Sequence, residues 1–81
     1  MKHKYTVILE REDDGGYHVY CPALPGCHSQ GETVEESLTN IREAVEVYLE
    51  SLRESGELPP LENEVLVTAT EVEAIAPVAS T

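Results

Sequence analysis

Two cysteines and two histidines lie close together in the chain, and such side chains can hold zinc or carry thiol chemistry. Zinc-binding cysteines are commonly two to four residues apart, whereas five residues separate Cys21 from Cys27. In a strand, His28 would also point to the opposite face from Cys27, because neighbouring side chains alternate. A disulfide is geometrically possible but is disfavoured in a reducing cytosol. With His18 as the remaining candidate ligand, the pattern predicts structural thiols, no metal site and no cofactor.

The histidines and carboxylates do not form a catalytic pattern in the sequence. Neither His18 nor His28 belongs to a recognisable motif with a Ser or Cys nucleophile. Metal-assisted hydrolysis needs several acidic residues that converge from adjacent strands. The apolar and aromatic stretch Tyr5–Leu9 carries none, and Glu10 stands only at its end. We therefore expect that the protein is not an enzyme.

A row of glutamates is the pattern most able to bind something. In the segment 34–57 glutamates recur every seven residues, with two more beside them. On a helix they fall within about 80° on the side opposite the apolar residues, and Val47 lies among them. Solvation alone explains such a face, because each like-charge pair costs only about 0.2–0.5 kcal/mol. An apolar centre ringed by charge is also how a docking site for a basic partner is built. The candidate contact residues are Glu36, Glu43, Glu46, Val47, Glu50 and Glu54.

The elements that would position these side chains begin with three strands. Alternation and β-branched or aromatic residues predict strands at Tyr5–Leu9, Tyr17–Cys21 and Cys27–Gly31. The first two are joined by Asp13–Gly16, whose two glycines adopt positive φ at little cost and therefore form a tight hairpin turn. The second and third are joined by Pro22–Gly26, whose prolines end hydrogen-bonded pairing. The prediction is a three-stranded antiparallel meander.

A helix is predicted from about residue 34 to 55. Thr33 fits a capping box, in which Glu36 reaches back to the Thr33 backbone N–H. Gly56 can cap the end of the helix, and Pro59 and the proline after it forbid continuation. Apolar residues recur at spacings of three and four, which is the pattern of one buried helix face. They are Val34, Leu38, Ile41, Val45, Tyr48 and Leu52.

The segment Glu64–Val72 is predicted to be a fourth strand because it is rich in β-branched residues. The element order is then βββαβ, an α+β fold with the helix on one face of the sheet. We expect one domain over residues 1–73 and a flexible tail over 74–81.

The charge of the chain restricts its partners. The net charge is −11, and most of it lies in residues 32–81, which carry twelve glutamates against Arg42 and Arg53. Such a surface repels phosphate backbones and favours a basic protein partner, although acidity can also serve solubility alone. No apolar run reaches the roughly 18 residues of a membrane span, and the first residues do not form a signal peptide. We expect a cytoplasmic protein without membrane contact.

The stretch Tyr20–Glu36 reads Y-C-P-A-L-P-G-C-H-S-Q-G-E-T-V-E-E. It resembles the signature of HicB-like antitoxins, in which a P-x-L-P-G-C turn is followed by a short strand, a G-x-T step and an acidic helix start. The resemblance covers about residues 4–55, and it implies the partial ribonuclease-H-like fold of that family, with the same βββαβ order. Ala23 departs from the pattern, since many relatives carry Asp there. The motif residues in this chain are Pro22, Leu24, Pro25, Gly26, Cys27 and Gly31.

The resemblance implies a type II antitoxin that binds and neutralises a small basic HicA-like toxin, a ribonuclease that cleaves messenger RNA with a histidine. Many relatives carry a further C-terminal DNA-binding module, whereas nine residues follow Val72 here, so we expect no nucleic-acid binding by this chain alone. The motif turn has two interpretations. Leu24 either packs beneath the helix, or forms an apolar loop tip that contacts the partner.

An alternative to the antitoxin is an orphan domain of the same fold, homo-oligomeric and with a regulatory or ligand-binding role. In either case we expect a dimer or tetramer, because a small sheet with two open edges gains buried surface by self-association.

Overall fold

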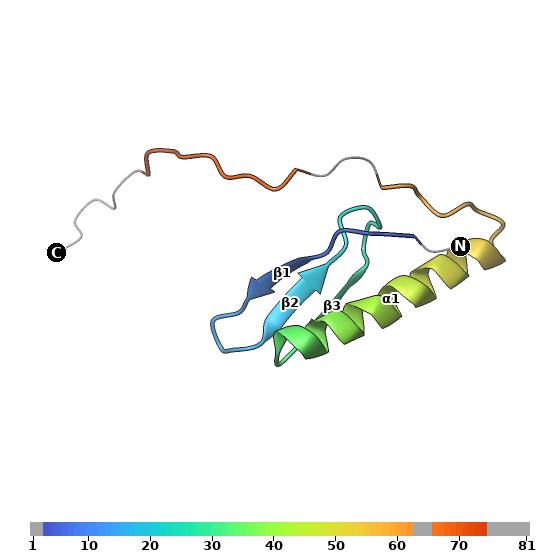
Figure 1. Ribbon diagram of the computed structural model, residues 1–81, viewed down its shortest axis with the longest axis horizontal. Coiled ribbons are helices and arrows are strands. Elements are labelled where there is room, and N and C mark those ends of the chain that lie inside the picture. The colour runs from blue at the N-terminus through green and yellow to red at the C-terminus, as the bar shows by residue number, and fades with distance from the viewer. Residues whose placement is uncertain (1–2, 63–65, 75–81) are drawn as a thin grey trace.

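The computed structural model describes residues 3–62 and 66–74, and shows a small antiparallel sheet with one long helix across it (Figure 1). The strands are β1 (Ile8–Arg11), β2 (Tyr17–Tyr20) and β3 (His28–Gly31), and the helix is α1 (Val34–Glu54). The sheet order is β1-β2-β3, so that β1 and β3 are its two edges. The α+β class and the strand–strand–strand–helix order are confirmed.

The hairpin between β1 and β2 forms at the predicted glycines. Gly15 and Gly16 have φ of 93° and 79°, and the Glu12 N–H donates to the Gly16 carbonyl at 3.0 Å. β1 begins three residues later than predicted, at the pair Ile8–Tyr20. Beyond Tyr20 the chain leaves β2 and enters the proline turn. Tyr5–Val7 therefore have no ladder partner. The prolines that end β2 therefore also shorten β1.

The helix begins and ends where its caps predict. The Glu36 N–H donates to Thr33 Oγ1 at 3.0 Å, but the Glu36 carboxylate accepts from the Glu32 N–H at 2.7 Å and not from that of Thr33. At the other end Gly56 has φ of 76°, and its N–H donates to the Arg53 carbonyl. The last turn is thus closed by a residue in the left-handed region, as glycine permits.

The core lies between α1 and the β2–β3 side of the sheet. Its buried residues are Val19, Cys21, Leu24, Cys27 and Ile41. The helix approaches β3 closely because Gly31 has no side chain: a Cβ there would lie 2.6 Å from the Ser37 backbone nitrogen. The Ser37 hydroxyl is fully buried and donates to the Thr33 carbonyl at 2.8 Å, so its burial leaves no unpaired donor.

The buried line of α1 is rotated from the predicted apolar stripe. Ile41 of the stripe is buried and Val45, Tyr48 and Leu52 are half-buried, as predicted. Val34 and Leu38 at its start are exposed, and Ser37 is buried in their place. The reason is steric, since the contact with Gly31 brings the small Ser37 onto the sheet and turns Leu38 away. A three-stranded sheet is also too narrow to cover the whole stripe of a 21-residue helix.

After α1 the chain returns to the N-terminal segment. The Tyr5 hydroxyl donates to the Pro60 carbonyl at 2.6 Å, and the Thr6 hydroxyl donates to a Glu62 carboxylate oxygen at 2.9 Å. These contacts bring the segment 57–62 beside the N-terminal extension of β1.

The fourth strand predicted at Glu64–Val72 requires a correction. Residues 66–74 form no strand and are exposed, including Leu66 and Val72, while residues 64 and 65 lie outside the described residues. A strand exists only by hydrogen bonding to a neighbour, and β-branched residues alone do not provide that neighbour. The predicted tail 74–81 lies outside the described residues, apart from Ala74. In the described ranges, no helix is long and apolar enough to cross a membrane.

Candidate protein-docking surface

The face of α1 that points away from the sheet is acidic and carries one large apolar side chain. Glu43 and Glu50 are exposed, as the helical pattern predicts. Val47 lies between them and is 69% exposed. An apolar side chain ringed by carboxylates is a candidate contact point, because binding patches are commonly built in this way.

A groove runs between this face and the edge strand β3. It has a volume of ≈ 560 Å³, and the helix supplies Glu43, Val47 and Tyr48 to one wall. The other wall contains the end of the motif turn, Gly26 and Cys27, followed by the start of β3. The structure therefore brings together two sets of predicted site residues that are far apart in the sequence.

The backbone of β3 faces this groove at an open sheet edge. The Cys21 N–H donates to the Cys27 carbonyl at 3.0 Å, and β2 and β3 are in antiparallel register with Val19 opposite Ser29. Hydrogen-bonded pairs alternate along such a ladder, so His28 and Gln30 direct their backbone groups away from β2. The Asn40 side chain donates to the Gln30 carbonyl at 2.7 Å and so covers part of the edge.

The other predicted contact residues lie elsewhere. Glu36 acts as a cap at the start of α1, through its bond to the Glu32 N–H. Glu46 lines a second groove on the far side of the helix, against the N-terminal segment. Glu50 and Glu54 are exposed on α1 but do not line the groove beside β3. The six predicted residues are therefore not one site.

The motif turn is held by its own hydrogen bonds and by one buried side chain. The Leu24 N–H donates to the Cys21 carbonyl at 3.1 Å, and the Cys27 N–H donates to the Leu24 carbonyl at 3.0 Å. Leu24 is fully buried, which settles its position in favour of the core. Gly26 has φ of 81°, in the left-handed region, and Pro25 is exposed.

The comparison with protein families assigns most of the chain to a known type of domain. The family model described as the HicB-like antitoxin of bacterial toxin–antitoxin systems matches residues 5–76. The chain belongs to the HicB-like antitoxin family. The match begins in the segment before β1 and includes all the strands, the motif turn and α1.

Relatives of this HicB-like chain occur in bacteria and archaea. A UPF0150 protein of Synechocystis sp. is 64% identical over 50 residues, which cover 62% of this chain and 63% of that protein. The chain thus matches less than two thirds of that relative's length. A UPF0150 protein of Thermoplasma acidophilum is 49% identical over 65 residues, which cover 80% of this chain and 94% of that protein.

Among solved structures, the HicB-like fold is similar to the N-terminal domain of the antitoxin HicB of Burkholderia pseudomallei. The TM-score is 0.59 at 34% sequence identity, and the match covers 80% of this chain and 69% of that one. The matched protein is described as an antitoxin, and this agrees with the family resemblance carried by the Tyr20–Glu36 motif.

Sequence reasoning missed the polar lining of the groove in this HicB-like domain. Ser29, Asn40 and Ser51 line it together with the predicted residues. Asn40 offers one signal, since an asparagine inside a helix, between the buried and the acidic faces, calls for a hydrogen-bond partner. Its partner, the Gln30 carbonyl, is known only once the strand edge is placed beside the helix.

The two cysteines are free thiols in the core and not an exposed ligand pair. Burial raises the pKa of the Cys27 thiol above its ordinary value of 9.0, and the neighbouring Cys21 raises it further. Burial likewise raises the pKa of Tyr5, with smaller contributions from Cys21 and Glu62. In the parts of the chain that the structure describes, no three of the His, Cys, Asp and Glu side chains are grouped as metal ligands.

The raised pKa of Cys27 predicts a loss of stability in alkaline solution. The folded state holds the thiol protonated, whereas the unfolded state releases the proton near the ordinary value. The stabilisation is complete well below the ordinary value of 9.0 and is lost as the pH rises from there through the folded-state pKa. Urea unfolding between pH 7 and 9.5 should show a falling free energy of unfolding. Cys27→Ala should flatten this decline, and an equally steep decline in the variant would assign it to other groups.

Proposed function

We propose that this chain is a cytoplasmic antitoxin that binds a small basic HicA-like toxin and blocks its ribonuclease activity. Membership of the HicB-like antitoxin family supports the antitoxin role. The net charge of −11 supports a basic partner, since an acidic antitoxin would compete with RNA for the positive surface of the toxin. The antitoxin would act through protein contact, by covering the active site of the toxin.

The observation that carries the proposal is the groove between the acidic face of α1 and the open edge of β3. Val47 would supply the apolar contact and Glu43 the charge, since both line the groove and are exposed. The outward backbone groups of His28 and the Gln30 N–H would supply hydrogen bonds to an extended segment of the partner, since Asn40 already occupies the Gln30 carbonyl. Because the charges are exposed, the complex would weaken as salt is raised above about 0.1 M.

Charge reversal tests this site. Glu43→Lys should weaken the complex with a basic HicA-like toxin about tenfold or more, because it places a like charge against the partner. Val47→Asp should weaken it similarly by removing the apolar contact. Affinity is measured by calorimetry with a catalytically inactive toxin, and neutralisation by survival of cells that express both proteins.

Glu46→Lys is the matched control, because it makes the same change on the same helix but lines the other groove. It should leave affinity within about threefold of the parent, as expected for a charge outside the contact. Equal losses for the changes at Glu43 and Glu46 would remove the groove from the proposal. A neighbouring toxin that is neither bound nor neutralised would overturn the antitoxin role.

The alternative, a homo-oligomeric orphan domain with a regulatory or ligand-binding role, is favoured by a different feature. The β1 edge is open, and beside it a groove of ≈ 770 Å³ is lined by apolar residues of the N-terminal segment and α1. These include Tyr5, Val7, Val45 and Leu49. A second copy could cover this surface, so the mass of the chain alone is measured by light scattering in the same experiments. A dimer or tetramer that binds no toxin would favour the orphan.

A further inference from the structure

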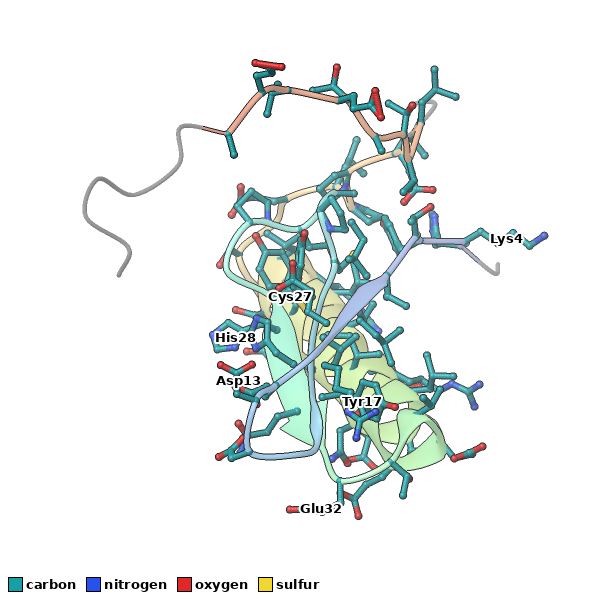
Figure 2. The ribbon with its side chains drawn as sticks, turned by 90° about the vertical axis from the view of Figure 1, so that its left-hand side faces the viewer. Lys4, Asp13, Tyr17, Cys27, His28 and Glu32 are labelled. Carbon is teal, nitrogen blue, oxygen red and sulfur yellow. The ribbon has the colours of Figure 1, made fainter. Side chains whose placement is uncertain are left out.

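The face of the sheet opposite α1 carries two histidines. Strand side chains alternate, and Val19 of β2 is buried toward the helix, so its neighbour His18 lies on the other face. Cys27, immediately before β3, is buried, whereas His28 at the start of β3 is exposed. Figure 2 shows His28 on the side of the sheet away from α1. The histidines thus form a surface pair, while the cysteines, which line the same shallow pocket, are buried.

The two imidazole rings are close to each other and reachable from solvent. The ring centroids of His18 and His28 are 5.5 Å apart with an interplanar angle of 37°. The β2–β3 register fixes this approach, because His28 is opposite Tyr20 and therefore diagonal to His18. His18 is half-buried and His28 is exposed, so an ion could reach the nitrogen atoms from solution.

The distance between the two ring centroids is close to that of two imidazoles that share one metal ion. Imidazole nitrogen binds zinc at about 2.0–2.1 Å, which places the ring centroids of two tetrahedral ligands about 5 Å from each other. The observed 5.5 Å is within a small side-chain rotation of that spacing. Glu10 is the register partner of His18 on β1, on the same face, so a carboxylate stands beside the pair and favours a cation.

We propose that His18 and His28 form a two-imidazole binding site for a borderline divalent metal ion of the Zn²⁺ class. Neutral imidazole is a preferred ligand of such ions. Water fills the remaining coordination positions, because the site is open to solvent on the uncovered sheet face. The two side chains lie on the sheet face opposite α1, whereas it is the backbone of His28 that we propose meets the partner in the groove beside β3.

Calorimetric titration with ZnCl₂ tests the site, in a buffer that does not bind metals and with His3→Ala as the starting protein. His3 is removed because its imidazole could compete for the metal. Its ring is stacked on that of Tyr5, with 6.2 Å between the ring centroids. We expect saturable binding of one ion per chain. His18→Gln and His28→Gln should each weaken it at least tenfold, because one imidazole is a poor ligand by itself.

Gln30→Ala is the matched control, since it alters the same face of β3 without removing a metal ligand. It should bind Zn²⁺ as the starting protein does, and circular dichroism checks that every variant is folded. The proposal is overturned if the starting protein shows no saturable binding of Zn²⁺. It is also overturned if His18→Gln or His28→Gln leaves the affinity for Zn²⁺ unchanged.

Discussion

Leu24→Ala should lower the free energy of unfolding by about 3 kcal/mol, which is among the largest effects of a single side chain in a domain of this size. Leu24 is fully buried and belongs to the core cluster with Val19 and Ile41. It also joins the motif turn to the core, because the turn's backbone bonds pass through its N–H and carbonyl. Removing its side chain leaves a cavity and releases the turn. Urea unfolding followed by circular dichroism measures the change.

Leu58→Ala is the matched control for this prediction. It deletes the same atoms from a leucine that is 90% exposed, so stability should change by less than about 0.5 kcal/mol. If Leu24→Ala lowers the free energy of unfolding no more than Leu58→Ala does, the turn does not depend on its buried side chain.

Gly31→Ala should cost about 2–3 kcal/mol for a different reason, namely overpacking. The added Cβ would lie 2.6 Å from the Ser37 backbone nitrogen and 2.7 Å from its hydroxyl oxygen. A backbone atom cannot rotate away, so β3 and the first turn of α1 would have to separate. The melting temperature should fall, and hydrogen exchange should accelerate at Ser37.

Gly15→Ala separates this steric cost from the ordinary cost of replacing glycine. Gly15 has φ of +93°, but nothing lies within 4 Å of the position of its Cβ. Its substitution should cost about 1–2 kcal/mol through backbone conformation alone, and should leave exchange at Ser37 unchanged. Faster exchange at Ser37 in both variants, or in neither, would refute the packing argument.

Features that depend on neighbours in the chain were predictable. The hairpin at Gly15 and Gly16, the cap at Thr33 and the end of α1 at Gly56 all formed as expected. Each depends on interactions across a few residues, which the order of amino acids specifies directly. The alternation that separates His28 from Cys27 is local in the same sense.

Features that depend on contacts between distant parts of the chain could not be predicted from the sequence. The rotation of α1 follows from the space left by Gly31, and the assembly of one groove from Glu43, Val47 and Cys27 follows from that rotation. The predicted strand at 64–72 failed among residues 66–72 because pairing needs an edge to bind, which propensity does not supply.

The sequence by itself therefore determined the class of fold, the family and the acidic character of the chain, since these lie in motif, spacing and charge. Only the tertiary structure decided which glutamates share a groove with Val47 and that His18 meets His28 across two strands. The physical reason is that packing depends on the fit between segments that are distant in the sequence. The close contact between Gly31 and Ser37, for example, sets which face of α1 meets the sheet.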